Sequence, residues 1–374
     1  TDLYFELCIS PWDFAASSLI LTEAGGVIKT NGGHEIDFKN KFVAIKIHFG
    51  EPGNIAYLRP NFAKVVADYV KEKGGYPFLT DCNTLYVGRR KNGLEHIDTA
   101  YENGFTPFST GCNVIIGDGI KGLSEVYVPV RNGELCEKAI IGKEIMEADI
   151  VISLAHFKGH EMTGFGGALK NIGMGCGSRA GKMDMHSASG PKVKTDKCVG
   201  CGSCMRNCAH GAISIVDKKA VIDRDKCAGC GRCIGACPFD AMAYIGDSSV
   251  EITSKKMAEY AMAVLDGREN FHINIVNNVS PYCDCHSEND VPIVPDIGMF
   301  ASFDPVAIDV ACADAVNAQP VMPNSILAER NQCHHDHFTD THPVTNWKYC
   351  VDHAEKIGLG TKEYELIEIR QNLF

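Results

Sequence analysis

The chain has 374 residues, and its 36 Lys and Arg against 47 Asp and Glu give a formal net charge of −11. This length suffices for two domains or one large one. The acidic balance disfavours nucleic acid and anionic membrane surfaces as partners. No apolar run reaches the roughly 18 residues that a membrane span requires, and acidic residues interrupt the apolar N-terminal stretch as no signal peptide would.

Residues 12–26 predict a helix that ends at Gly25 and Gly26. This stretch resembles the second signature of the inositol monophosphatase family, in which Asp13 would match a metal ligand. The other signature of that family, D-P-x-D-G-T, does not occur in this sequence, and one carboxylate does not make a two-metal site. We therefore expect residues 1–40 to be a remnant or fused fragment, packed as a helix plus a strand, without phosphatase activity.

From Phe42 onward, apolar strands alternate with amphipathic helices. The expected strands cover 42–49, 77–80, 114–116, 126–130 and 150–154, and the expected helices cover 60–73, 94–103 and 140–146. This alternation predicts an α/β fold, with a mainly parallel sheet and helices on both faces. Ligands of such sheets bind at the carboxyl ends of the strands, which here carry His48, Asp81-Cys82-Asn83 and His156.

Residues 154–186 combine many glycines with side chains that can do chemistry. A glycine-rich loop brings backbone N–H groups close to an anion or cofactor, and histidines transfer protons near neutral pH. The alternative is a solvated connector with scattered charge. The candidate catalytic residues are His156, His160, Lys170 and His186, and the candidate cofactor-binding residues are Lys158, Gly166, Gly167, Asn171 and Cys176.

Eight of the 18 cysteines form two runs with C-x2-C-x2-C-x3-C spacing, the second followed by Pro238. This is the pattern of bacterial two-cluster ferredoxins, in which the fourth cysteine of each run ligates the cluster of the other run. The pattern predicts two [4Fe–4S] clusters, a reducing cytoplasmic location, and a ferredoxin-like α+β insert. The expected ligand sets are Cys198, Cys201, Cys204 and Cys237 for one cluster, and Cys227, Cys230, Cys233 and Cys208 for the other.

The two runs are an internal repeat with an offset of 29, seen in Asp196-Lys197-Cys198 and Asp225-Lys226-Cys227. Zinc is the alternative, but zinc sites do not need a third C-x2-C step and a fourth cysteine, twice over. Helices are expected again at 254–265, 305–316 and 347–357, with a strand at 271–276. The predicted domains are therefore 41–190 and 247–374 for the two parts of the α/β core, and 191–246 for the insert.

Three further stretches have ambiguous patterns. Tyr282-Cys283-Asp284-Cys285-His286 could bind a metal, lie near a cluster, or serve structure alone. Asp304, followed by Pro305, is expected to cap a helix. The run His334-His335-Asp336-His337 has the composition of a metal-binding tract, but we expect a surface loop.

Residues 41–374 resemble the family named domain of unknown function 362, whose members are often labelled Fe–S center proteins. The resemblance is carried by 43–51, 79–86, 156–160 through His186, 305–309 and 357–360. A looser resemblance links His160, Gly164-Phe165-Gly166-Gly167, Lys170 and His186 to the nickel-pincer lactate racemase family. That resemblance implies a cofactor-anchoring Lys170, with His160 and His186 as acid/base residues or a metal ligand.

The leading hypothesis is an iron–sulfur redox protein that carries electrons to or from a His/Lys/Cys-lined site in an α/β cleft. It implies a redox partner protein or a small-molecule acceptor. One alternative is a ferredoxin-type carrier or docking module without chemistry of its own. Another is a metal- or cofactor-dependent isomerase or racemase that uses His160, Lys170 and His186 and holds an additional cofactor. A homo-oligomer is compatible with each hypothesis.

Overall fold

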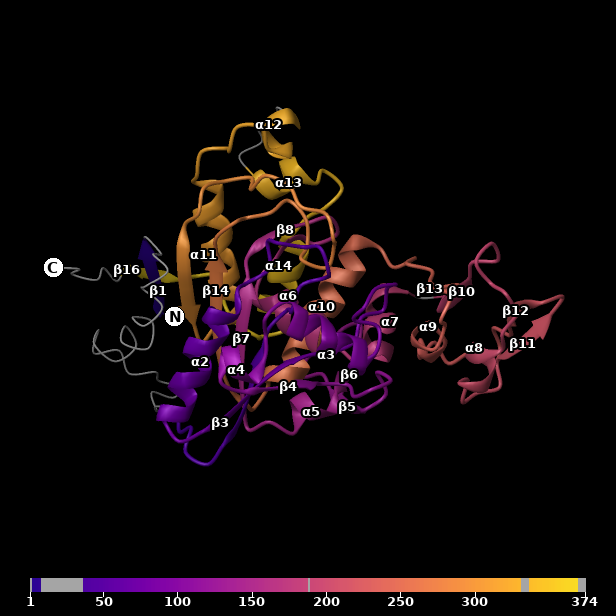
Figure 1. The fold of residues 1–374 in the computed structure, drawn as a ribbon. Coiled ribbons are helices and arrows are strands. Elements are labelled where there is room, and N and C mark those ends of the chain that lie inside the picture. Colours follow the sequence, from indigo (N-terminus) through magenta and orange to yellow (C-terminus); the bar gives the residue numbers. More distant parts are fainter. Residues whose placement is uncertain (1, 8–35, 188, 331–335, 369–374) are drawn as a thin grey trace.

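The computed structural model describes residues 2–7, 36–187, 189–330 and 336–368 (Figure 1). Its centre is an eight-stranded sheet with the order β16-β1-β15-β14-β7-β2-β3-β4. The strands are β1 (Asp2–Leu7), β2 (Phe42–Lys46), β3 (Tyr76–Asp81), β4 (Asn113–Ile116), β7 (Ile150–His156), β14 (Glu269–Val276), β15 (Gly298–Ser302) and β16 (Glu365–Glu368).

The sheet is parallel through its centre and mixed toward one edge. Strands β14, β7, β2, β3 and β4 run parallel to one another, whereas β15 is antiparallel to both β14 and β1. The mainly parallel α/β sheet expected from the sequence is therefore confirmed. Because the five parallel strands end at one edge, the residues that follow β2, β3, β7 and β14 are brought together there.

Buried side chains alternate between the two faces of the central strands. Val43, Ile45 and Ile152 belong to one apolar cluster, and Ala44 and Val151 belong to another. This period of two is what a strand covered on both faces requires. The helices α2 (Pro60–Glu72) and α3 (Gly93–Glu102) cover the first face, and α6 (Ala168–Cys176), α10 (Val250–Leu265), α11 (Pro305–Asn317) and α14 (Lys348–Lys356) cover the second.

The expected helix over 140–146 is wrong. Residues 138–142 form β6 (Lys138–Gly142), which pairs antiparallel with β5 (Glu125–Pro129) outside the main sheet. Only α5 (Lys143–Met146) is helical in this stretch. The apolar residues Ile140 and Ile141 fit a strand as well as a helix, and pairing with β5 decides between them.

Shorter elements complete the described fold. They are α4 (Pro107–Thr110), α7 (Arg179–His186), α12 (Ile326–Arg330), α13 (His337–Thr341) and the hairpin of β8 (Lys158–His160) and β9 (Gly164–Gly166). The helix expected around Trp12 and Asp13, and the residues His334 and His335, lie outside the described residues. Asp336 caps α13 by accepting from Phe338 N and Thr339 N, and Trp347 Nε1 also donates to it.

Residues 191–246 lie at one side of the sheet and extend away from it (Figure 1). Their first strand, β10 (Pro191–Val193), pairs antiparallel with their last strand, β13 (Met242–Tyr244). Between them lie the hairpin of β11 (Ile213–Val216) and β12 (Lys219–Ile222) and two four-residue helices, α8 (Ser203–Arg206) and α9 (Arg232–Gly235). The chain therefore leaves the α/β body and returns to it at one place.

None of the helices in the described part of the chain is long and apolar enough to cross a membrane.

Asp304 is a helix cap, as expected from the sequence. Its Oδ1 accepts from the N–H groups of Val306 (2.8 Å) and Ala307 (3.0 Å), and its Oδ2 accepts from Thr361 N (2.9 Å). The same carboxylate thus fixes the start of α11 and the approach to β16.

We predict that Asp304→Ala lowers the free energy of unfolding by about 1–2 kcal/mol, because the first turn of α11 loses its acceptor. Urea denaturation monitored by circular dichroism measures this change. Asp304→Asn keeps one acceptor oxygen and should cost less. Equal losses in the two variants would contradict the capping role.

Candidate functional site at the carboxyl ends of the strands

The hairpin β8–β9 begins where the central strand β7 ends, and it carries His160. Helix α6 follows with Lys170, and α7 ends at His186. The loop between β14 and β15 supplies Cys283 and Cys285. The parallel strands deliver all four segments to the same edge of the sheet, so candidate residues far apart in sequence meet there.

Gly159 allows the closest approach at this edge. Its N–H donates to Ser280 O over 2.8 Å. A Cβ at this position would lie 2.5 Å from Pro281 O, which is closer than any real side chain tolerates. A glycine is therefore required for the loop to pack on the hairpin and bring Cys283 against His160.

The middle residue of the C-x-C sequence holds that sequence in place. Asp284 is buried, and its carboxylate contacts His156 Nδ1 at 2.9 and 3.0 Å and Lys158 Nζ at 3.3 Å. His156 Nε2 also lies 2.9 Å from Asn277 O, in the residue that follows β14. Two candidate residues, His156 and Lys158, thus position the loop rather than face the centre of the site.

Around Cys283 the structure gathers groups from three elements. Lys170 Nζ lies 3.4 Å from Cys283 Sγ. The ligand-type atoms of His160, Cys283 and Cys285 all lie within 4.8 Å of one another, as do those of Glu161, Cys285 and His286. Both groups are near enough to share a metal ion, although Glu161 and His286 already bond each other over 3.0 Å.

The charges of these groups adjust to one another. A hydrogen bond from Cys285 and the ammonium of Lys170 hold the pKa of the Cys283 thiol well below its usual range, despite burial. Burial alone would lower the pKa of Lys170, but the neighbouring Cys283 and Cys285 outweigh the effect of burial and raise the pKa of Lys170 above its ordinary value. Burial and the neighbouring Lys170 and His160 lower the pKa of His186 to about 4, so this imidazole is neutral at pH 7.

His186 connects this site to the cysteine-rich segment. Its ring lies 5.6 Å from the ring of Tyr244 in β13. His186 Nδ1 is buried, and among the described residues it has no hydrogen-bond partner. A buried polar atom without a partner is uncommon in proteins and is typical of a site that receives a ligand or a water molecule.

The remaining candidate residues support the fold around the site. Asn171 bonds Lys46 Nζ at 2.9 Å, in a buried network that includes Asp81. Cys176 is buried, accepts from Cys82 Sγ through its carbonyl oxygen at 3.4 Å, and has a pKa that burial raises to about 11. A Cβ at Gly166 would lie 3.1 Å from Lys170 Cδ.

The N-terminus of α6 already has an anion. Asp309 accepts from the N–H groups of Ala168 (2.7 Å) and Leu169 (2.9 Å), and a Cβ at Gly167 would meet its Oδ1 at 2.3 Å. The glycine-rich loop expected to hold a phosphate or carboxylate ligand therefore holds a carboxylate of the chain itself. His48 and Asn83 also have hydrogen-bond partners within the chain. His48 Nδ1 accepts from Gly50 N at 3.1 Å, and Asn83 Nδ2 donates to Asp118 Oδ1 at 2.7 Å.

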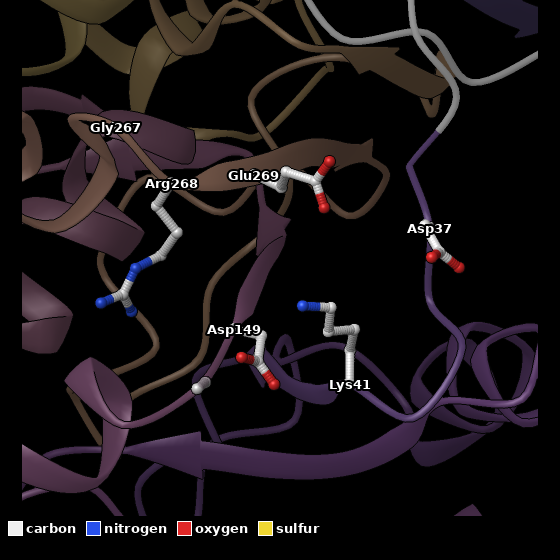
Figure 2. Close-up of a pocket in the computed structure, with 7 residues that line it drawn as sticks. Asp37, Lys41, Asp149, Gly267, Arg268 and Glu269 are labelled. Carbon is white, nitrogen blue, oxygen red and sulfur yellow. The ribbon is translucent and has the colours of Figure 1, made fainter.

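A separate cavity of about 530 Å³ lies at the opposite edge of the sheet, where β2, β7 and β14 begin. Figure 2 shows Asp37, Lys41, Asp149, Arg268 and Glu269 around it. Arg268 is engaged by Ile145 O and Met146 O at 2.7 and 3.0 Å, and Asp149 accepts from Phe42 N at 2.8 Å. It contains none of the sequence candidates, so the cysteine-containing edge is the better functional site.

The cysteine-rich segment repeats its geometry as well as its sequence. Gly200 and Gly202 have φ values of 70° and 75°, and Gly229 and Gly231 have 69° and 65°. The fourth cysteine of each run accepts a backbone N–H from the residue four positions on, Ala212 N to Cys208 Sγ at 3.4 Å and Ala241 N to Cys237 Sγ at 3.3 Å. Both halves thus point backbone donors at sulfur.

The sulfurs of the two runs have neighbours from both runs. Burial raises the pKa of Cys204, and the nearby Cys237 and Cys198 raise it further. Burial raises the pKa of Cys233 to about 12, and the nearby Cys230, Cys227 and Cys204 raise it further. Cys204 therefore lies beside the fourth cysteine of the other run.

The chain belongs to the family described as "Domain of unknown function (DUF362)", which matches residues 43–314. Its fold is similar to that of the lactate racemase apoprotein from Thermoanaerobacterium thermosaccharolyticum, at 13% identity and a TM-score of 0.36, over 73% of this chain and 50% of that one. A crystal structure of a protein from Thermotoga maritima gives 11% identity and a TM-score of 0.34, over 71% and 51%.

Among curated proteins, the Nus factor SuhB of Escherichia coli (strain K12) is 34% identical over 71 residues, which is 19% of this chain and 25% of that protein. The same figures hold for SuhB of Salmonella typhimurium (strain LT2). The chain thus spans about a quarter of the length of these relatives and about half of the two solved structures.

The structure brings the sequence candidates His160, Lys170 and His186 together. It adds Cys283 and Asp284 to the site, and the C-x-C pattern was the only sequence feature that pointed to these two residues. Glu161 and Tyr244 had no such feature, because their contacts join segments distant in sequence, and Asp309 stood only within the family-resemblance stretch 305–309.

We predict that Asp284→Asn lowers the free energy of unfolding at pH 7 by about 3 kcal/mol, because Lys158 loses a buried partner. His156 and Lys158 outweigh burial and hold the pKa of Asp284 below its ordinary value. Its stabilising effect is therefore present above about pH 4, the unfolded value, and is lost as pH falls through the folded value.

Urea titrations between pH 2 and pH 7 test this, since the two proteins should converge at the acid end. The exposed Asp98 provides the matched control variant, Asp98→Asn, which should match the wild type throughout. A constant difference between Asp284→Asn and the wild type at every pH would contradict the charge-pair explanation.

Proposed function

We propose that this protein is an iron–sulfur redox protein, which carries electrons through two [4Fe–4S] clusters to or from the site around His160, Lys170 and Cys283. Residues 191–246 are the inserted ferredoxin-type domain, between the core parts 41–190 and 247–374. The observation that carries the proposal is the position of Cys204, which lies beside Cys198 of its own run and beside Cys237, the fourth cysteine of the other run.

The cluster-binding residues would be the two crossed sets, Cys198, Cys201, Cys204 and Cys237, and Cys227, Cys230, Cys233 and Cys208. When bound, the clusters supply one-electron transfer. The chain contributes N–H groups directed at sulfur, which favour the reduced cluster. Lys219 also fixes the first run, since its Nζ donates to Cys198 O at 2.6 Å and Thr195 O at 2.8 Å.

The second run lies nearer the α/β body than the first. A Cβ at Gly231 would lie 3.1 Å from Arg179 Cγ, and one at Gly190 would lie 4.0 Å from Cys227 Sγ. The hairpin β11–β12, next to the first run, lies farther out in Figure 1. This order gives the outer cluster access to a redox partner and places the inner cluster toward His186.

We predict about eight irons per chain in anaerobically purified protein, four for each cluster. Cys237→Ser should lower the iron content and remove one reduced-cluster signal in electron paramagnetic resonance, because its sulfur belongs to the first cluster. The buried Cys112, remote from both runs in the sequence, provides the control variant Cys112→Ser, which should keep all the iron. About one zinc per run instead of iron would overturn the proposal.

A carrier without chemistry of its own is the second candidate, and the convergence at Lys170 argues against it. Lys170→Met should leave both clusters reducible by dithionite but should slow their reoxidation by an acceptor that uses the site at least tenfold. Stopped-flow absorbance follows reoxidation by a panel of small-molecule acceptors. Lys41→Met, at the opposite edge of the sheet, is the matched control. Identical reoxidation in all three proteins, for every acceptor, would support the carrier.

An isomerase or racemase that uses His160, Lys170 and His186 is the third candidate, because Lys170 and His160 both lie near His186. It requires a further metal or cofactor at these residues. Elemental analysis of the same purified protein separates it from the redox proposal, since stoichiometric nickel beside the iron would favour the isomerase.

A further inference from the structure

Cys283 and Cys285 lie in a tight turn. The N–H of His286 donates to Cys283 O over 3.0 Å and closes a four-residue turn. The turn folds the segment back on itself, so the two thiol sulfurs lie within 4.8 Å of each other. A disulfide needs the sulfurs to close to about 2.05 Å by side-chain rotation and the Cα atoms to lie about 4.4–6.8 Å apart, and residues two apart in a tight turn are near enough in the backbone for this.

The hydrogen bonds of His160 argue against a metal ion here. Its Nδ1 accepts the N–H groups of Met162 (3.0 Å) and Thr163 (3.2 Å). A nitrogen that accepts two N–H groups carries no proton, so the neutral ring carries its proton on Nε2. Metal binding through Nε2 would move that proton to Nδ1, where it would face two donors.

The Nε2–H of His160 is therefore a donor close to Cys283, because the ligand-type atoms of His160, Cys283 and Cys285 lie within 4.8 Å of one another. Lys170 Nζ donates to Cys283 Sγ at 3.4 Å, and the neighbouring thiol of Cys285 is a third donor. Cys283 is only 1% exposed, whereas Cys285 is half-buried. Three donors around one buried sulfur stabilise a thiolate at Cys283 and leave the proton of the pair on Cys285.

The pair also lies close to the cysteine-rich segment. Burial raises the pKa of Tyr244, and the neighbouring Cys285 and Glu161 raise it further. Tyr244 follows the second cysteine run by seven residues and packs against His186. The C-x-C turn thus lies where the segment meets the α/β body.

We propose that Cys283 and Cys285 are a dithiol–disulfide couple that exchanges electrons with the two clusters. This inference rests on the proposed function of residues 191–246. In the reducing direction, the disulfide would accept two electrons, one from each reduced cluster, and the S–S bond would break. One proton goes to Cys285 Sγ, and Cys283 remains a thiolate beside Lys170. In the oxidising direction, the S–S bond forms, one proton leaves and two electrons return to the clusters.

The couple would allow the site to transfer two electrons in one step, which a single cluster cannot do. Each cluster transfers one electron, whereas a disulfide takes two together. The pair therefore gathers two one-electron steps into one two-electron step, which suits a substrate reduced or oxidised by two electrons.

An anaerobic reductive titration of the cluster-loaded protein tests the proposal. The protein is first oxidised with ferricyanide and then titrated with dithionite. The wild type should take up about four electrons per chain, two for the clusters and two for the disulfide, and Cys285→Ser should take up about two. Cys112→Ser is the matched control and should behave as the wild type.

Alkylation with N-ethylmaleimide, followed by peptide mass spectrometry, identifies the sulfurs. In the oxidised protein the 283–285 peptide should be two hydrogens lighter and unlabelled. After reduction its labelling should rise more than tenfold, in step with the two extra electrons.

Equal electron uptake by the wild type and Cys285→Ser, with clusters present, would overturn the couple and leave the proposed function intact. A stoichiometric metal other than cluster iron, lost in Cys285→Ser, would overturn it in favour of a metal site. Protein with no clusters after iron reconstitution would overturn both proposals.

Discussion

The buried pairing of Asp284 with His156 and Lys158 is the interaction on which the functional edge of the molecule depends. It joins the end of β7 to a loop more than 120 residues later, since the contact of His156 with Asp284 spans 128 positions. The residues on either side of Asp284 are the two cysteines of the site. An ion pair of this kind adds little net stability compared with apolar packing, but removing one partner is costly. Its value here is position, because it fixes the direction in which Cys283 faces.

The charges at this edge balance within a small volume. Lys158 is neutralised by Asp284, Lys46 by Asp81, and Lys170 has the sulfur of Cys283. His186 stays neutral, since burial and Lys170 lower its pKa to about 4. These three buried cations therefore each have an anionic neighbour, which is the condition for holding charge away from water. Only at Cys283 is the anion itself a reactive group.

The sequence allowed the class of the fold to be predicted, because it depends on local spacing. Alternating apolar strands and helices required a parallel sheet with two covered faces, and Val43, Ala44 and Ile45 divide between the faces as that pattern demands. The family resemblance over residues 43–314 is confirmed. Residues 140–146 were mispredicted because pairing of β6 with β5 outweighs helical spacing.

The site could be predicted only in part, for a different reason. His160, Lys170 and His186 lie within 27 residues of one another, so their glycine-rich setting marked them. Asp309 and Asp284 come from elsewhere in the chain, and no local pattern distinguishes a carboxylate that caps α6 or fixes a loop from one at the surface. Asn171, Cys176 and Gly167 were marked by the same setting, and the structure places them in packing and helix contacts.

The pairing of its first and last strands fixes where the cysteine-rich segment joins the α/β body. Because β10 pairs with β13, the segment returns to the body beside the end of α7, and its last strand sets Tyr244 against His186. A longer connection would have left the second cysteine run free of the body, but Arg179 packs against Gly231 within that run. Arg179 is itself nearly fully buried and bonded to Lys121 O at 2.9 Å. The same helix therefore carries both the contact with the second run, at its start, and the histidine of the site, at its end. A rigid eight-residue helix spans only about 12 Å. Helix α7 and the strand pairing that closes the segment therefore fix the separation between the second cysteine run and His186, across which electrons would pass.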